Sequence, residues 1–451
     1  DADSQTEITE TCISPNADFG DPSNLRTVEI FYPSGLERTS GRLKKVIYPD
    51  SRMDTYTYEF GTWVSGAFVA GNGDAERQEV LHGTIDHPEG IAFKTTREIT
   101  FSDDLGRVVR TEEQVFTGNG YERLTYTENV YDWLGNLVKT KASDGKITEA
   151  AWGCCGKESE ISATGIETTF TYDDLKRPTM VTKTGFAGQP DITTSYTYDS
   201  VGRQTGTAVR AGNLEAITRI EYDKAGRLTS QTDSQGLTIA YAYADGGRTT
   251  NVTRPGGATE ITAYYGDGRL KSITGTAVVS KYYTYGVNPD GSRWTQMNTG
   301  SPDSPAWVRT TSDLAGRSLR TEKPGPQGMI QVTGKFYNNY GQLVKTTSPG
   351  KADMLYIYDD LDRKTISGLD VDHNGRLDLA SSDRINETET AYVKENGEWW
   401  VENHQMVYAD INDDNPSTVA TQRTQISGLG INNEIGESLS IDIHGNITRA
   451  Q

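Results

Sequence analysis

Residues 198–203 read Tyr-Asp-Ser-Val-Gly-Arg, and residues 222–227 read Tyr-Asp-Lys-Ala-Gly-Arg. Between Arg177 and Arg363 the arginine of this motif, or its replacement, returns every 21–26 residues, with Arg293 dividing one double interval. Weaker copies of the motif occupy 103–107, 131–136, 172–177, 243–248, 265–269, 312–317, 337–342 and 358–363. Such a fixed period is the signature of a repeat array rather than of several unrelated globular domains.

Each copy reads as a β-hairpin. The residues before the motif alternate, as in Ser-Tyr-Thr-Tyr at 195–198, so that paired tyrosines share one face of a strand. The aspartate starts a turn by accepting hydrogen bonds from the nearby backbone, and the glycine supplies a positive φ. A second turn, such as 233–236, closes the unit. The sequence therefore predicts an all-β repeat array of antiparallel hairpins with essentially no helix.

This pattern resembles the YD-repeat family, which includes Rhs proteins, teneurins and toxin-complex shells, over about residues 95–451. The resemblance implies that the hairpins form a continuous spiralling sheet, a YD-repeat β-shell. In bacterial toxin complexes and Rhs effectors the shell encloses a toxic polypeptide, and in teneurins it is an extracellular adhesion scaffold. The Pro…Asp-Pro-x-Gly motif that precedes the toxin in Rhs shells does not occur here, so the sequence does not support toxin delivery.

Four segments are predicted along the chain. Residues 1–94 match the repeat poorly and read as an atypical N-terminal β cap, and 95–365 form the YD-repeat array. Residues 366–435 read as an insertion, and 436–451 as a last partial repeat. We expect the chain to be a fragment of a longer protein.

Composition excludes several classes of protein. Hydrophobic residues make up 34% of the 451 residues, while Gly reaches 47 and Tyr 24 copies, which fits thin strands and tight turns better than a helical core. The net charge of −19 disfavours nucleic acid as a partner. No apolar stretch approaches 18 residues, so we expect no membrane span.

Residues 370–378 read Asp-Val-Asp-His-Asn-Gly-Arg-Leu-Asp, with oxygen-bearing residues at alternate positions. This spacing resembles the calcium loops of dockerins and integrin propellers and predicts a structural Ca²⁺ site. Position 12 is Ser381 instead of the glutamate of an EF-hand, so Asp383 is the candidate replacement. The alternative is an acidic turn without a metal. The candidate ligands are Asp370, Asp372, Asn374, Arg376 through its carbonyl, Asp378 and Asp383. Residues 410–414 form a second acidic loop.

Other residues leave their interpretation open. Cys12, Cys154 and Cys155 are too few for a disulfide framework, and allow a bridge from Cys12, a vicinal disulfide or free thiols. Trp399 and Trp400 either form a glycan-stacking platform or pack inside the protein. His82 and His87 are candidates for a metal ligand or a base, although two histidines without an apparent partner are typical of polar loops.

No catalytic residue is assigned, because the repeated Asp and Arg fit turn chemistry and a catalytic site needs one unique constellation. We therefore expect a secreted or cell-surface structural protein, a β-shell that encloses, spaces or adheres. Its expected partners are other segments of its own longer chain, an enclosed polypeptide, or a cell-surface or glycan partner. The alternatives are a carbohydrate-active protein (a glycan-binding module, polysaccharide lyase or glycoside hydrolase) and a toxin-enclosing shell without its C-terminal part.

Overall fold

The computed structural model describes residues 5–12, 17–35, 37–84, 96–359, 361–408, 416–426 and 438–450. These residues form one sheet of 35 strands. Within them the only helical elements are two three-residue 3-10 turns, η1 (Asp245–Gly247) and η2 (Pro326–Gly328). The predictions of an all-β fold and of one continuous sheet of antiparallel hairpins are confirmed.

Strands that follow one another in the chain pair antiparallel, as β15 and β16 do along their whole length. The one branch is at β4, whose far end pairs with β5 and whose longer part pairs with β6. The first twelve strands are β1 (Thr6–Thr11), β2 (Leu25–Phe31), β3 (Leu43–Ile47), β4 (Arg52–Val64), β5 (Ala67–Ala70), β6 (Ala75–Thr84), β7 (Thr96–Ser102), β8 (Val108–Phe116), β9 (Tyr121–Tyr131), β10 (Leu137–Ala142), β11 (Ile147–Trp152) and β12 (Lys157–Ile161).

The middle of the chain continues the same meander. Its strands are β13 (Glu167–Tyr172), β14 (Pro178–Lys183), β15 (Ile192–Tyr198), β16 (Gln204–Ala211), β17 (Leu214–Tyr222), β18 (Leu228–Thr232), β19 (Thr238–Ala244), β20 (Thr249–Thr253), β21 (Thr259–Tyr264), β22 (Leu270–Thr274), β23 (Lys281–Val287) and β24 (Arg293–Thr299). The last strands are β25 (Trp307–Ser312), β26 (Ser318–Pro324), β27 (Ile330–Tyr337), β28 (Leu343–Thr347), β29 (Asp353–Tyr358), β30 (Lys364–Asp370), β31 (Arg384–Glu395), β32 (Glu398–Val407), β33 (Ser417–Gln425), β34 (Ser438–Asp442) and β35 (Ile447–Ala450).

The YD motif forms the turn between two strands, and the β15–β16 turn shows how. One Asp199 carboxylate oxygen accepts hydrogen bonds from the backbone N–H groups of Val201 and Arg203, at 3.1 and 2.9 Å. The other oxygen accepts one from Arg203 Nε at 2.7 Å. Gly202 adopts φ +93°, a conformation that a side chain would strain. The motif therefore encodes a closed tight turn, as its sequence predicts.

Consecutive repeats are joined through tyrosine. Tyr222 Oη donates a hydrogen bond to the Gln204 carbonyl of β16 at 3.1 Å, and Tyr198 Oη makes the equivalent bond to Pro178 at 2.7 Å. In both repeats an arginine from the preceding turn lies over the ring. Because each hairpin depends on its neighbour for these contacts, the array is stabilised between repeats as well as within them.

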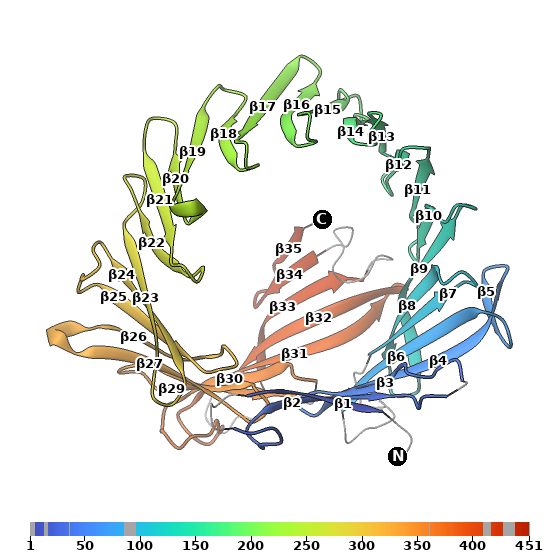
Figure 1. The fold of residues 1–451 in the computed structure, drawn as a ribbon. Helices are drawn as coiled ribbons and strands as arrows, with labels where there is room; N and C mark the ends of the chain where they lie inside the picture. The colour runs from blue at the N-terminus through green and yellow to red at the C-terminus, as the bar shows by residue number, and fades with distance from the viewer. Residues whose placement is uncertain are drawn as a thin grey trace.

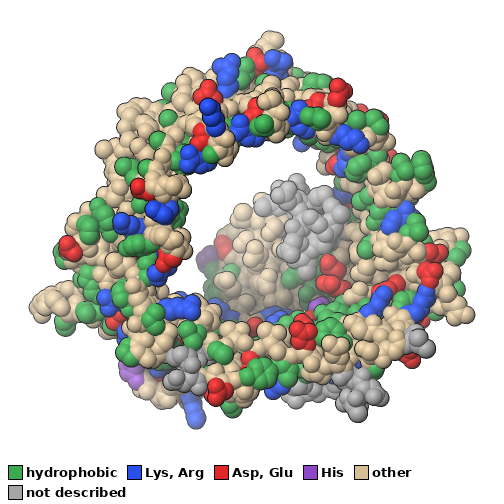
Figure 2. Space-filling model, in the orientation of Figure 1, with side chains coloured by type: hydrophobic (Ala, Val, Ile, Leu, Met, Phe, Trp, Pro, Cys, Tyr) green, Lys and Arg blue, Asp and Glu red, His purple; other side chains and the backbone are tan. Residues whose placement is uncertain are grey.

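The sheet curls into a ring (Figure 1). Strands β1–β4, β6, β29 and β30 lie at the bottom of this view, β26 and β27 at the lower left, β5 and β7–β12 on the right, and β13–β18 at the top. Figure 2 shows that side chains leave the centre of the ring open, and that Lys and Arg side chains recur along its inner edge. The negative net charge is therefore not spread evenly over the ring.

Strands β31–β35 lie within the outline of the ring, and β32 packs against the wall (Figure 1). Buried side chains of β8 and β9, Val115 and Leu124, join Trp399 and Val401 of β32 in one hydrophobic cluster with Ile426. At its border Lys394 Nζ lies 3.2 Å from the Glu122 carboxylate. Residues almost three hundred positions apart are thus packed face to face, and the sheet has two layers here.

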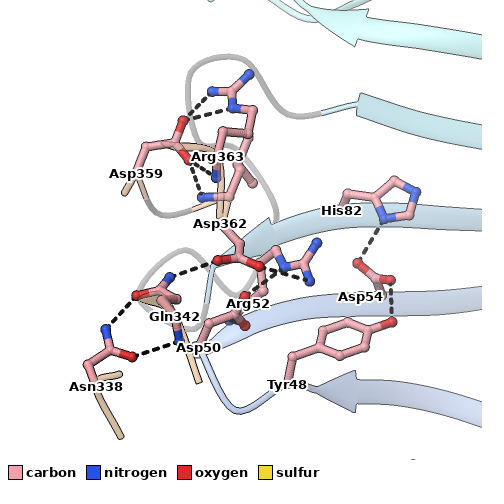
Figure 3. A network of polar contacts seen from close by, with 11 residues as sticks. Tyr48, Asp50, Arg52, Asp54, His82, Asn338, Gln342, Asp359, Asp362 and Arg363 are labelled. Atoms are coloured by element: carbon pink, nitrogen blue, oxygen red, sulfur yellow. Dashed lines mark hydrogen bonds and ion pairs between the residues drawn. The ribbon is translucent and has the colours of Figure 1, made fainter. Parts of the chain in front are cut away.

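A seam joins the first strands to the later repeats (Figure 3). Asp362, in the β29–β30 turn, accepts a hydrogen bond from Gln342 Nε2 at 2.8 Å, and its carboxylate lies 4.0 Å from the Arg52 guanidinium of β4. The side chain of Leu25 packs beside Gly341. Among the described residues no strand pairing joins these two parts, and side chains at turns close the ring here.

In the described part of the chain no helix is long and apolar enough to cross a membrane. The sheet runs without a break from β7 into β30 and on into β33. The division into a cap, an array, an insertion and a final partial repeat remains a prediction, because strand pairing alone sets no boundary between these segments.

Candidate functional site

The acidic loop predicted from the sequence connects β30 to β31. Asp370 is the last residue of β30, and only 2% of it is exposed. Asp383 precedes β31, so the two ends of the loop start from adjacent paired strands. This pairing brings together two carboxylates that are separated by twelve residues of loop.

Oxygen atoms of Asp370, Asp372 and Asp383 lie within 4.8 Å of one another. The Asp370 carboxylate accepts hydrogen bonds from the backbone N–H groups of Asn374 at 3.0 Å and Gly375 at 2.9 Å. Asp383 accepts them from Val371 at 2.8 Å and Asp378 at 3.2 Å. The loop thus wraps around its own carboxylates, leaving oxygen atoms of three of them close together. Carboxylate oxygens are ligands that Ca²⁺ prefers.

The proximity of the three carboxylates affects their pKa values. Loss of hydration raises the pKa of Asp372 above its usual value, and the negative charges of Asp383 and Asp378 raise it further, against a hydrogen bond from the Asn374 N–H. For Asp383 partial burial acts in the same direction, but hydrogen bonds from the Val371 and Asp378 N–H groups outweigh it and lower the pKa. A divalent cation would relieve the repulsion felt by Asp372.

The remaining predicted ligands hold the loop together. Asn374 Nδ2 donates hydrogen bonds to Asp372 and to Asp378, each at 3.0 Å. The Asn374 side-chain oxygen accepts one from the Arg376 backbone N–H at 2.8 Å, so it is occupied within the loop. The substitution of Asp383 for the missing position-12 ligand agrees with the geometry. The second acidic loop, 410–414, lies outside the described residues.

Trp399 and Trp400 are 8% and 9% exposed. Trp399 belongs to the hydrophobic cluster between β32 and the wall, and the Arg423 guanidinium lies 4.8 Å from the Trp400 ring centroid. A glycan-stacking platform needs an open ring face, which this burial removes. The geometry therefore supports the alternative in which both rings pack inside the protein.

The cysteines are unbonded thiols. Cys12 follows β1, and its Sγ contacts the Ala17 carbonyl at 3.6 Å. Cys154 and Cys155 lie in the β11–β12 turn with their sulfur atoms 3.1 Å apart. Of the arrangements left open by the sequence, the structure places only the vicinal pair in mutual contact.

Sequence reasoning missed the partners of His82. This residue lies in β6, and its Nδ1 is 2.8 Å from Asp54 Oδ1 of β4. Asp54 also accepts a hydrogen bond from Tyr48 Oη at 3.0 Å (Figure 3). Burial and the Asp54 charge raise the pKa of Tyr48 to about 12. The polar-loop interpretation of His82 is wrong, because residues 75–84 continue the strand pattern; His87 lies outside the described residues.

Residues 162–335 match the family model of the teneurin YD-shell. This segment, less than half of the chain, is similar to a YD-shell repeat array. It contains the turns at 173–177, 199–203, 223–227 and 313–317, all of which close through the same aspartate and arginine contacts. The resemblance to YD-repeat proteins is thereby confirmed.

Three solved structures align over most of this chain, at low TM-scores and identities. A crystal structure of TcdB2-TccC3-TEV aligns with a TM-score of 0.39 and 11% identity, covering 95% of this chain and 23% of that chain. A crystal structure of TcdB2-TccC3 aligns with a TM-score of 0.31 and 11% identity, covering 95% of this chain and 31% of that chain. A structure of the Photorhabdus luminescens Tc holotoxin pore aligns with a TM-score of 0.27 and 10% identity, covering 98% of this chain and 33% of that chain. The chain thus spans about a quarter to a third of the length of these solved chains. No curated protein matches its sequence.

Proposed function

We propose that this chain is a non-catalytic wall segment of a YD-shell that encloses another polypeptide. The observation that carries the proposal is the unbroken 35-stranded sheet curled around an open centre (Figure 2). A wall of this kind excludes large molecules through its continuous hydrogen bonding and needs no reactive residue. The aspartates and arginines of the repeats, residue types that are also common in catalytic sites, are used here in turn closure, as in Asp223 with Arg227.

Protection from proteolysis tests enclosure. Strand β35 lies within the outline of the ring, whereas β1 forms part of its wall (Figure 1). An unstructured peptide with a protease site is attached after Gln451, and the same peptide before Asp1 is the matched control. We expect the C-terminal peptide to be cut several-fold more slowly than the N-terminal one. Equal cleavage rates in the folded protein would count against enclosure.

We further propose that the 370–383 loop binds one structural Ca²⁺ through Asp370, Asp372 and Asp383. The support is the proximity of three carboxylates, one of them buried, on a loop whose sequence has calcium-type spacing. Isothermal titration of Ca²⁺ into chelator-treated protein is expected to give one saturable site. Absence of saturable heat, with the protein folded by circular dichroism, would reject the site.

A secreted or cell-surface location follows as part of the proposal, since calcium is abundant outside cells and modules there bind it at about 10⁻⁴–10⁻³ M. The expected partners are the enclosed polypeptide and further shell segments of a longer chain. Adhesion to a cell surface is a second role for such a wall. Fractionation of the source cells, with the protein detected by antibody, tests the location: recovery in the cytoplasm alone would contradict it.

A further inference from the structure

The β11–β12 turn departs from the YD motif. Residues 152–157 read Trp-Gly-Cys-Cys-Gly-Lys and take the place of a Tyr-Asp-x-x-Gly-Arg motif. The turn is closed by a hydrogen bond from the Gly153 N–H to the Gly156 carbonyl at 2.9 Å. Trp152 Nε1 donates a hydrogen bond to the Leu137 carbonyl at 2.9 Å, as the motif tyrosines donate to the preceding repeat. Lys157 lies 5.6 Å from the Trp152 ring centroid within the same turn. The scaffold of the motif is retained while two thiols occupy its tip.

The two thiols are in contact and reachable from solvent. Cys154 Sγ lies 3.1 Å from Cys155 Sγ. Cys154 is exposed and Cys155 is partly exposed. Beneath them the Tyr172 ring packs on Gly156, and the Glu158 carboxylate packs on Gly153. The base of the turn is therefore fixed, and the sulfur atoms are held at its outer end.

Charged groups from the neighbouring turn face Cys155. A hydrogen bond with Cys154 raises the pKa of the Cys155 thiol, Asp174 raises it slightly, and the Lys176 ammonium opposes both. Lys176 has φ +62°, at a position where most repeats have glycine. The Cys155 S–H can donate to Cys154 Sγ, 3.1 Å away, and Cys154 is the more exposed sulfur, so we expect Cys154 to be the first nucleophile of the pair.

We propose that Cys154 and Cys155 are a redox-active vicinal dithiol that a small-molecule disulfide, such as oxidised glutathione, converts reversibly to an eight-membered disulfide ring. The Cys154 thiolate attacks the glutathione disulfide, forms a mixed disulfide and releases one glutathione thiolate. Cys155, after losing its proton to solvent, attacks Cys154 Sγ and releases the second glutathione. The protein loses two electrons and two protons, and oxidised glutathione is reduced to two molecules of glutathione.

The ring is expected to be labile. Adjacent Cα atoms lie about 3.8 Å apart across a trans peptide, below the roughly 4.4–6.8 Å that unstrained disulfides span. Strain of this kind makes a disulfide easier to reduce. The pair is therefore suited to a reversible modification of one turn of the shell, and not to a permanent cross-link.

The test uses the whole 451-residue chain, equilibrated in glutathione buffers from fully reduced to fully oxidised. Samples are quenched with acid, alkylated with N-ethylmaleimide and measured by mass spectrometry with peptide mapping. We expect Cys154 and Cys155 to lose alkylation together, with no glutathione adduct and a mass loss of two hydrogens that dithiothreitol reverses. Cys12 serves as an internal single thiol.

Three variants make the result decisive. Cys155→Ser and Cys154→Ser are each expected to carry one glutathione at the remaining thiol, because no partner can close the ring. Cys12→Ser should leave the paired transition unchanged. The proposal is overturned if the wild-type pair takes up two separate glutathiones, if both thiols stay alkylatable in all buffers, or if either one bonds to Cys12.

Discussion

The guanidinium of Arg203 lies 4.7 Å from the ring centroid of Tyr222 and so joins two successive repeats. Arg203 also donates from Nε to Asp199 in its own turn, and from Nη1 to the Asp223 carbonyl of the next turn at 3.1 Å. One side chain thus closes a hairpin and fixes its neighbour. The planar, multiply donating guanidinium suits this double role better than an ammonium group does.

Arg203→Lys is accordingly expected to destabilise the array although it preserves the charge. Lysine cannot reach Asp199, Asp223 and the Tyr222 ring at once, so the loss is about 1 kcal/mol, the scale of a partly buried cation–π contact. Urea denaturation measures it. Arg210→Lys is the matched control, because the Arg210–Glu215 pair is exposed and bridges no repeats. Equal effects of the two substitutions would show that Arg203 does not couple repeats.

Acid is expected to destabilise the shell through its turn aspartates. Partial burial opposes the shift, but hydrogen bonds from the turn backbone and the arginine lower the pKa of Asp103 and Asp199. The same direction holds for Asp132, Asp173, Asp223 and Asp442. A carboxyl group whose pKa is lowered by folding stabilises the folded protein at pH values above its ordinary pKa of 3.8. This stabilisation is lost as the pH falls through the folded-state pKa. Denaturation midpoints should therefore begin to drop at about pH 5 and continue to fall below pH 3.8; a flat profile would contradict this.

The repeat, its hairpins and the all-β fold could be predicted because each is local. Turn closure by Asp199 and Arg203 involves residues four apart, and the alternation of 195–198 marks its strand directly. The proximity of Asp370 and Asp383 was also within reach, since calcium-type spacing pointed to Asp370, and Asp383 was the candidate replacement for the ligand missing at position 12. Its cause, the pairing of β30 with β31, was not visible in the loop sequence.

Contacts between distant parts of the ring could not be predicted. The packing of Trp399 on Leu124 and the approach of Arg52 to Asp362 depend on the curvature of the whole sheet, which no single repeat encodes. A signal did exist at Asp362: aspartate replaces the motif glycine and adopts φ +61°. A residue that accepts this strain often has a reason elsewhere in the structure.

Asp362→Gly and Lys176→Gly separate strain from contact at the seam. Both substitutions place glycine at the same motif position, where the native residues adopt left-handed φ angles of +61° and +62°, and both therefore relieve backbone strain. Only the first also removes contacts to Gln342 and Arg52. We expect Asp362→Gly to be less stable than Lys176→Gly by up to about 1 kcal/mol. It should also speed hydrogen exchange at 48–52 and 338–342; unchanged exchange there would mean that Asp362 does not close the ring.

His82 is expected to make the first strands sensitive to alkaline conditions. Its hydrogen bond with Asp54 raises the His82 pKa above 6.5, against the effect of burial. A group whose pKa is raised by folding contributes its full stabilisation to the folded protein at pH values below its unfolded-state pKa. This contribution is lost as the pH rises through the folded-state pKa. NMR titration should show His82 titrating above 6.5. His82→Gln should remove the fall in stability from about pH 6 to pH 9; the same fall in the variant would assign it to other groups.

The effect of Asp372→Asn on the melting temperature is expected to reverse its sign when calcium is added. Without the ion, loss of hydration and then repulsion from Asp383 and Asp378 raise the Asp372 pKa, so neutralising Asp372 should leave the melting temperature equal or higher. With calcium at about a hundred times Kd, the wild-type protein gains about 2.7 kcal/mol, and a variant without one ligand gains much less. The order of the two melting temperatures should therefore reverse when calcium is added. Asp303→Asn, in an exposed turn outside the loop, is the charge-matched control and should respond to calcium as the wild type does. If wild type and Asp372→Asn shift equally, the ion binds elsewhere.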